Sequence, residues 1–301
     1  DTKNMLTAGK ALPSIYGADS PKMNAADLRT SGYELSLSWR DMFKLAGKPF
    51  GYGVTATLSD YRSVITKYDN PEKSFADSYY EGKRIGEIWG FVVDGLFDST
   101  EEAQAYAKEV DLGYFSKRLT GGWQGGDLKY VDLDGDGEIS LGQNTVNNPG
   151  DRKIIGNSLA SLQYGFNFSF DWLGFDFNIF LQGTGNHYWY PTAENMQFWG
   201  PYSTPYTSFL PKNFLDNCWD EDNKDAYFPR PRAYAANSTV SPLGATNTRY
   251  LQNLRYLRLK SLTIGYTIPE KLTSKIKLEQ VRFYFSGENL AYWSPIKKYS
   301  K

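Results

Sequence analysis

Large apolar and polar side chains alternate between Tyr164 and Gly183, on both sides of the dipeptide Leu173-Gly174. Cross-strand partners share one face of a sheet, so a two-residue turn at Leu173-Gly174 would gather the large apolar groups on a single face. This pattern predicts a hairpin with strands over 164–172 and 175–183. The apolar parity consists of Tyr164, Phe166, Phe168, Phe170, Trp172, Phe175, Phe177, Ile179 and Leu181.

The same alternation recurs in two other parts of the chain, and each part predicts a further pair of strands. In the first pair, a connection from Asp41 to Pro49 would place Trp39 opposite Phe50. In the second pair, the apolar positions change parity near Lys260, which predicts a β-bulge at that point. The four additional strands are expected over 33–40, 50–59, 254–268 and 281–290.

The connections between these six strands sort by length. Links within the hairpins are short, whereas 61–163 and 184–253 are long, and in an antiparallel sheet both long links lie at the same end. Short turns at one end and long extracellular loops at the other are typical of outer-membrane barrels. We therefore expect an all-β segment of a large antiparallel transmembrane β-barrel. A capping box from Ser99 to Glu102 predicts one short loop helix, ending near Glu109.

Composition narrows the choice of function. The 33 basic and 34 acidic residues nearly balance, so a nucleic-acid partner is not expected. No apolar run is long enough for a transmembrane helix. His187 is the only histidine and Cys218 the only cysteine, which excludes histidine triads, multi-histidine zinc sites and an internal disulfide. With no nucleophile–base pair evident, we do not expect an enzyme.

An acidic loop begins at Asp132 and resembles the opening of an EF-hand calcium loop. Carboxylates at positions 1, 3 and 5 can converge on one hard cation, and the seventh residue, Glu138, can offer its carbonyl. Position 12 is Gln143 instead of glutamate, so a more distant carboxylate would have to complete a structural Ca²⁺ site. A solvated acidic turn is the alternative. The predicted ligands are Asp132, Asp134, Asp136, Glu138 and Asp151.

Aromatic residues are frequent in the second long loop. In a barrel they would lie on the extracellular side, where flat rings can stack on sugars or pack against a partner protein. The alternative is that they only pack the loop together. The candidates for substrate or partner binding are Trp189, Tyr190, Trp199 and Tyr202.

Several ordered motifs resemble the C-terminal part of the SusC/RagA family of TonB-dependent outer-membrane transporters. The resemblance extends over nearly the whole chain, and it includes Tyr16-Gly17-Ala18-Asp19 within the segment from Pro13 to Trp39. The other motifs are GKRIGEIWGFVVDGLF from Gly82, DLKYVDLDGDGE from Asp127, GDRKIIG from Gly150, YLRLKSLTIGYTIP ending at Pro269, and VRFYFSGENL from Val281.

This resemblance implies a 22-stranded barrel with an N-terminal plug and a SusD-like surface lipoprotein over its mouth. Such proteins import glycans or, in some members, peptides, and they are energised through the TonB complex. No plug domain is recognisable in the chain, and the closing strand expected after Lys301 is absent from it.

We therefore expect the barrel portion of a glycan or peptide importer, embedded in the lipid of the bacterial outer membrane. The alternative is a secreted or surface-attached, calcium-stabilised β-sandwich that binds glycans. The two differ in whether the apolar strand face contacts lipid or a second sheet.

Overall fold

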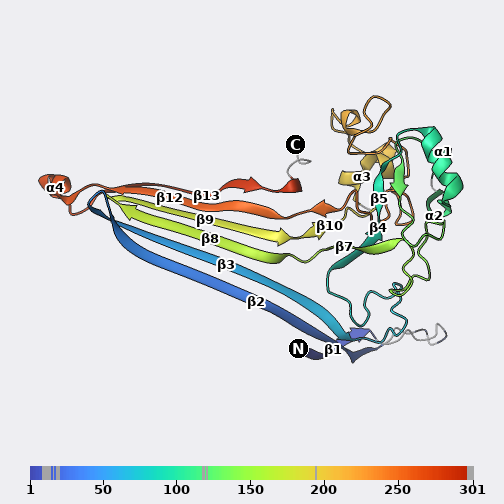
Figure 1. Ribbon diagram of the computed structural model, residues 1–301, viewed down its shortest axis with the longest axis horizontal. Coiled ribbons are helices and arrows are strands. Elements are labelled where there is room, and N and C mark those ends of the chain that lie inside the picture. Colours follow the sequence, from blue (N-terminus) through green and yellow to red (C-terminus); the bar gives the residue numbers. More distant parts are fainter. Residues whose placement is uncertain are drawn as a thin grey trace. The chain divides into compact units, whose positions relative to one another are not determined.

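The computed structural model describes residues 1–8, 15, 17, 21–116, 119, 121–193 and 195–296 (Figure 1). Pro13, Tyr16, Ala18 and Asp19, which contribute to the resemblance above, lie outside these residues. The chain divides into two compact units, each assembled from three segments. The sheet unit comprises the described parts of Thr30–Ser63, Leu159–Tyr188 and Asn253–Lys301, and the loop unit those of Asp1–Arg29, Val64–Ser158 and Trp189–Gln252.

One antiparallel sheet contains all the long strands, in the order β1-β2-β3-β8-β9-β12-β13 (Figure 1). Short β1 pairs with the first residues of β2. By connectivity, the tight turns join the strands at one end of the sheet, and both long connections leave from the other end. The strands are β1 (Thr2–Ala8), β2 (Lys22–Leu45), β3 (Lys48–Lys67), β8 (Ser161–Trp172), β9 (Phe175–Asn186), β12 (Tyr256–Thr267) and β13 (Arg282–Trp293).

The hairpin formed by β8 and β9 has the register expected from the sequence. Trp172 pairs with Phe175, and Phe170 pairs with Phe177. Leu173 and Gly174 both have positive φ, 51° and 83°, as a two-residue turn with the twist of the flanking strands requires. The rings of Phe170 and Phe177 stack with their centroids 5.2 Å apart. The alternating pattern alone was therefore enough to place this hairpin.

The turn between β2 and β3 differs from the prediction. The strands extend to Leu45 and Lys48, so only Ala46 and Gly47 form the turn, not the segment from Asp41 to Pro49. Phe43 instead of Trp39 lies beside Phe50, with ring centroids 5.1 Å apart. Ala46 and Gly47 both have positive φ, 51° and 75°, and this backbone conformation forms a tight turn. The shift is an even number of residues, so the faces are unchanged.

The predicted β-bulge in β12 is present. The pairing of β12 with both β9 and β13 shifts between Leu259 and Ser261. Leu259 pairs with Leu181 before the shift, and Leu262 pairs with Ile179 after it, so both remain on the apolar side of the sheet. The extra residue therefore corrects the change of parity seen in the sequence.

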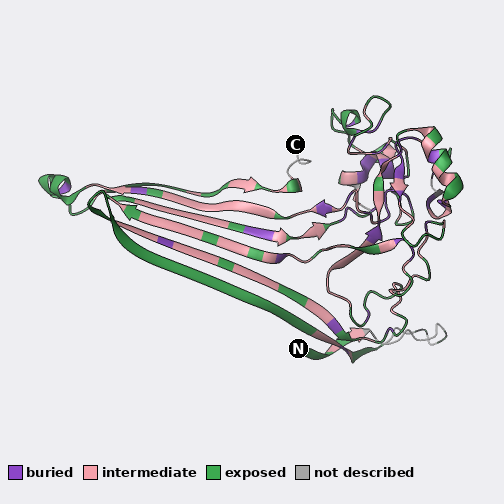
Figure 2. Ribbon diagram, in the orientation of Figure 1, coloured by how far each residue is buried: buried purple, intermediate pink, exposed green. Residues whose placement is uncertain are grey.

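The strand registers give the sheet one apolar and one polar face. One row of paired residues crosses five strands on the apolar face: Tyr52, Phe170, Phe177, Ile264 and Phe285. The adjacent row on the polar face is Gly53, Ser169, Asn178, Thr263 and Ser286. Large residues on the apolar face remain accessible, and Figure 2 shows β2 exposed along almost its whole length.

The two long connections share a hydrophobic core within the loop unit. Buried aromatic and aliphatic side chains from both connections meet in one cluster, which includes Phe97, Phe115, Tyr130, Trp199 and Tyr250. Ser99 caps α1 by accepting a hydrogen bond from the Glu102 N–H, as the capping box predicted. None of the helices in the described ranges is long and apolar enough to cross a membrane.

The shorter elements surround this core or connect strands. In the connection between β3 and β8 they are β4 (Glu87–Phe91), β5 (Val93–Leu96), α1 (Thr100–Glu109), α2 (Gly113–Ser116), β6 (Leu128–Tyr130) and β7 (Arg152–Asn157). Between β9 and β12 they are β10 (Tyr188–Trp189), α3 (Met196–Ser203), β11 (Gln252–Asn253) and 3₁₀ turns at Pro205–Thr207 and Leu215–Asn217. Between β12 and β13 they are α4 (Glu270–Thr273) and a 3₁₀ turn at Ser274–Ile276.

A glycine in the loop unit provides a test of this packing. Gly126 has φ +84°, and an added Cβ would lie 2.5 Å from the Trp219 ring. Gly122 has a similar φ of +73° but open space around it. Gly122→Ala should lower stability only through the strain of a left-handed backbone conformation, by about 1–2 kcal/mol. Gly126→Ala should also displace Trp219 and lower stability clearly more. Hydrogen exchange of the β6 amides measures the difference, and equal effects of the two variants would contradict the packing described.

Candidate functional site

The acidic loop brings three of its predicted ligands together. Carboxylate oxygens of Asp132, Asp134 and Asp136 all lie within 4.8 Å of one another. Calcium–oxygen distances are about 2.3–2.6 Å, so ligands on opposite sides of one ion are separated by roughly twice that length. The spacing of the three groups therefore fits a shared hard cation. Carboxylate oxygens are also the donor type that calcium prefers.

Backbone N–H groups organise this cluster. The two oxygens of Asp132 accept from the N–H groups of Gly135 and Gly137, at 2.7 and 2.8 Å. Burial alone would raise the pKa of Asp132, but these hydrogen bonds outweigh it and hold the pKa below its ordinary value. Asp132 therefore stays ionised beside two other carboxylates. The resulting repulsion is what a bound cation would relieve.

Asp151 holds the backbone of the acidic loop through two hydrogen bonds. It is fully buried, and its two oxygens accept from the N–H groups of Leu133 and Ser140, both at 2.7 Å. Asp151 thereby ties together the beginning and end of the acidic loop. Burial raises its pKa, and the two hydrogen bonds counteract that rise. This geometry gives Asp151 a structural role, and its role as a calcium ligand stays a prediction. Glu138 lies outside the carboxylate group, which leaves its main-chain carbonyl as its predicted contribution.

Three of the four aromatic residues predicted to bind substrate or partner lie inside the core of the loop unit. Trp199 and Tyr202 are 0% exposed and Tyr190 is 6% exposed. Trp199 Nε1 donates to the Pro191 carbonyl at 2.8 Å, and both tyrosine hydroxyls donate to main-chain carbonyls. The structure corrects the prediction for these three, because their rings pack the loop unit internally. Trp189 is 39% exposed and remains a candidate.

A buried ion pair in the loop unit was not anticipated from the sequence. Asp127 Oδ2 lies 2.5 Å from Arg232 Nη1, and both side chains are almost completely buried. Burial raises the pKa of Asp127 to about 6, although Arg232 and the Gln124 N–H oppose the rise. The two residues are far apart in the sequence, so no local pattern could have paired them. The ion pair joins the segment before the acidic loop to the second long connection.

The polar face of the sheet forms a network of hydrogen bonds. Asn167 and Asn178 exchange hydrogen bonds across β8 and β9, at 3.4 and 3.3 Å. The hydroxyls of Thr263 and Ser286 share one hydrogen bond across β12 and β13, at 3.1 Å. These groups are neutral and mutually satisfied, so this part of the face suits contact with water.

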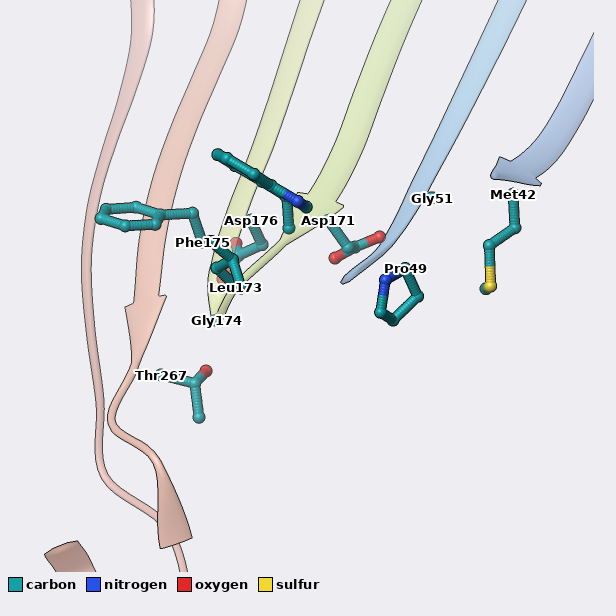
Figure 3. A pocket seen from close by; sticks show the side chains of 10 residues that line it. Met42, Pro49, Gly51, Asp171, Leu173, Gly174, Phe175, Asp176 and Thr267 are labelled. Carbon is teal, nitrogen blue, oxygen red and sulfur yellow. The ribbon is translucent and has the colours of Figure 1, made fainter. Parts of the chain in front are cut away.

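The face becomes charged near the tight turns. A hollow of about 330 Å³ lies there. Figure 3 shows the side chains that line it, which come from three hairpin ends. Asp171 and Asp176 pair directly across β8 and β9 within this hollow. Like charges in such positions repel. Arg282 offsets the repulsion by binding both oxygens of Asp176, at 2.9 and 2.6 Å.

No family model matches the chain. Two curated relatives are TonB-dependent receptors of Formosa agariphila. Receptor P3 is 27% identical over 294 residues, which is 93% of this chain and 26% of that protein. Receptor P26 is 23% identical over 307 residues, covering 98% of this chain and 28% of that protein. The chain therefore spans about a quarter of the length of the curated relatives it matches.

The fold is similar to that of solved transporter structures. A structure of the RagAB peptide transporter superposes with a TM-score of 0.61 at 19% identity, covering 97% of this chain and 29% of that one. The RagAB peptide importer in its closed-closed state gives a TM-score of 0.58, also at 19% identity.

These similarities confirm the resemblance to SusC/RagA-type TonB-dependent transporters and the antiparallel β fold predicted from the sequence. The sheet is not closed within the residues described, since β1 and β13 are its two edges. The relatives are named as receptors and transporters, which agrees with the expectation of a non-enzymatic protein.

The role of Asp151 can be tested by an isosteric change. Asp151→Asn replaces one acceptor by an amide donor that faces a backbone N–H, which should weaken the loop by about 1–3 kcal/mol. Hydrogen exchange at the Leu133 and Ser140 amides should accelerate accordingly. Asp134→Asn is the control, because exposed Asp134 accepts from the loop backbone through one oxygen only, which an amide oxygen can replace. Similar acceleration in both variants would argue against the role assigned to Asp151.

Proposed function

We propose that this chain is the barrel portion of a SusC-like nutrient importer in the bacterial outer membrane. It contributes barrel wall and extracellular loops to a longer transporter. A SusD-like surface lipoprotein works with that transporter, and the TonB complex energises it. The imported nutrient is a glycan, an oligosaccharide or a peptide. The support comes from the faces of the sheet, from its connectivity and from the relatives named above.

The apolar face is the observation that carries this proposal. Its central rows are filled by aromatic and branched aliphatic side chains on neighbouring strands. Trp39 is 62% exposed and Phe285 is 58% exposed, although both lie on this face. A wide exposed apolar surface of this kind marks an interaction site in a soluble protein. Opposite a neutral polar face, along strands of this length, it fits the lipid-facing side of a membrane barrel.

The same exposure argues against the glycan-binding sandwich. In a sandwich, the inner faces of two sheets interdigitate and form the core. Within the described residues, no such layer covers the exposed side chains of Trp39, Ile264 and Phe285. Lipid is the surrounding that fits this face best.

Connectivity supports the orientation of the barrel. Both long connections leave the sheet at the end opposite the tight turns, and in outer-membrane barrels the long loops are extracellular. The two long connections are then extracellular, and the hollow beside Asp171 lies at the periplasmic end. Partner, energy coupling and substrate class come from the resemblance and from the names of the relatives.

We also propose a structural Ca²⁺ ion in the acidic loop. Asp132, Asp134 and Asp136 would hold it, with the main-chain carbonyl of Glu138 as a further ligand. The ion would neutralise repulsion among the three carboxylates and so strengthen a loop whose backbone Asp151 already ties together.

A charge placed on either face tests the lipid assignment. Phe168→Arg would place a cation in the hydrocarbon layer and should cost about 2–4 kcal/mol of barrel stability. Ser169→Arg places the same group on the polar face and should cost much less. Denaturant titration of the full-length receptor, refolded in phospholipid vesicles, measures both. Equal losses, or a receptor that is compact and monodisperse without detergent or lipid, would overturn the proposal.

Removal of two loop carboxylates tests the calcium site. Asp134→Ala combined with Asp136→Ala should abolish Ca²⁺ binding measured by calorimetry on the full-length receptor, while the barrel remains folded. Asp220→Ala with Asp222→Ala is a matched control, because Asp220 also accepts from the N–H two residues later, at 2.8 Å. Absence of Ca²⁺ binding to the unaltered receptor, or equal loss in the control, would contradict the site.

A further inference from the structure

The connection between β12 and β13 differs from the other turns at its end of the sheet. The turns after β2 and β8 are two-residue turns, whereas this connection contains α4 and a 3₁₀ turn. Figure 1 shows α4 beyond the ends of the long strands. Two residues are enough to join antiparallel strands, so the additional residues are not needed to reverse the chain. We call the segment from Pro269 to Gln280 the helical turn.

Backbone hydrogen bonds give the helical turn a defined fold. Lys277 has φ 58° and ψ 32°, in the left-handed region. Its N–H donates to the Ser274 carbonyl, and the Leu278 N–H donates to the Thr273 carbonyl, both at 3.1 Å. This is the Schellman arrangement that ends a helix. The helical turn is therefore a folded cap on the hairpin and not an extended loop.

Exposed apolar and basic side chains alternate along the helical turn. Leu272, Ile276 and Leu278 are 55%, 65% and 48% exposed. A lysine directly precedes each of them in the chain, and each lysine is exposed as well. The surface of the turn thus carries apolar groups and positive charges side by side. The lysines are Lys271, Lys275 and Lys277.

The apolar face of the sheet continues up to the helical turn. Tyr266 pairs with Phe283, and both belong to the apolar parity of their strands. At the next position of that parity, the Ile268 N–H donates to the Val281 carbonyl at 2.9 Å, so these two residues share the face. The helical turn therefore begins where the face assigned to lipid ends.

A phospholipid interface accommodates both kinds of side chain at once. The acyl chains take up leucine and isoleucine side chains, while lysine lays its apolar stem along them and extends its ammonium to the phosphate groups. A protein surface over the same turn would have to bury or pair each lysine beside its apolar neighbour, which is costly. Charge is complementary as well, because three lysines outnumber Glu270 and Glu279 in the turn.

We infer that the helical turn is an interfacial anchor that binds the phospholipid headgroups of the periplasmic leaflet. Leu272 and Ile276 enter the boundary between headgroups and acyl chains, and the lysines bind phosphate. The inference rests on the proposed barrel and goes beyond it, because a barrel wall needs only its strands to contact lipid. The anchor sets the depth of the β12–β13 hairpin in the bilayer.

Spin labels on the full-length receptor in phospholipid nanodiscs test the position of the turn. A nitroxide is attached at Ile276→Cys in a receptor whose native cysteines are replaced by alanine. Its collision rates with oxygen, which concentrates in lipid, and with a water-soluble nickel chelate are then compared. The oxygen-to-nickel ratio should be several-fold higher than at Ser274→Cys, the matched control. Ser274 is also exposed, but it lies on the opposite side of the helical stretch from Leu272 and Ile276.

The lipid composition tests the role of the lysines. Nanodiscs of phosphatidylcholine with added phosphatidylglycerol should draw the label at Ile276→Cys deeper than phosphatidylcholine alone, because anionic headgroups attract basic segments. Lys271→Gln combined with Lys275→Gln and Lys277→Gln should remove this difference. No difference in the receptor with its lysines, or the same difference in the triple variant, would contradict the phosphate contact.

A label at Phe285→Cys separates the anchor from the proposed function. Phe285 lies on the apolar face of β13, so its label must report lipid if the chain is barrel wall. Equal ratios at Ile276→Cys and Ser274→Cys would overturn the anchor, and so would an Ile276→Cys label shielded from both reagents by another part of the receptor. Either result with a lipid signal at Phe285→Cys would leave the barrel standing, whereas a water-like ratio at Phe285→Cys would overturn the barrel itself.

Discussion

The structure depends on what covers the apolar face of a single-layer sheet. Burying one large aliphatic or aromatic side chain is worth about 1.5–3 kcal/mol, and the row from Tyr52 to Phe285 alone contains five such residues. Soluble domains meet this need with a second layer of protein. Here the opposite face is polar and hydrogen-bonded within itself, so the sheet is built for two different surroundings. Strand pairing satisfies the backbone groups between neighbouring strands, which is the condition for crossing lipid.

The loop unit uses the same kinds of residue in the opposite way. Aromatic rings that would face outward on a membrane strand turn inward here, and Trp199, Tyr202 and Tyr250 form a core of edge-to-face contacts. The polar atoms of these rings reach main-chain carbonyls, so their burial leaves few groups unsatisfied. The ion pair of Asp127 and Arg232 joins the two long connections. In the strands, the apolar side chains therefore point outward, toward a face suited to lipid. In the long connections they point inward, into a core suited to surroundings of water.

Sequence patterns predicted the features of the fold that depend on the alternation of neighbouring residues. They did not predict contacts between residues that are far apart in the sequence. Alternation and the Leu173-Gly174 turn defined the β8–β9 register, and the parity change located the bulge in β12. A register shift by an even number of residues leaves every side chain on the same face, so alternation cannot detect it. The faces of β2 and β3 were therefore predicted correctly, whereas the partner of Trp39 was not. The spacing of aromatic residues in a loop does not indicate whether the loop folds into a core of its own. For this reason Trp199 and Tyr202 were expected on the surface, although they are buried. The spacing of the acidic loop predicted its three converging carboxylates, but the long-range contacts of Asp151 leave no signal in spacing.

Hydrogen bonds within the protein and repulsion among carboxylates both act on the acidic loop. Asp151 and the N–H groups around Asp132 hold the loop backbone through hydrogen bonds within the protein. These same N–H groups keep Asp132 ionised, and its charge lies beside Asp134 and Asp136. The fold thus sets the positions of the three carboxylates, and the repulsion between them is what a bound ion would relieve. A cation bound there would stabilise the loop locally through that relief, and the strands, which pair through their own backbone, would not depend on it.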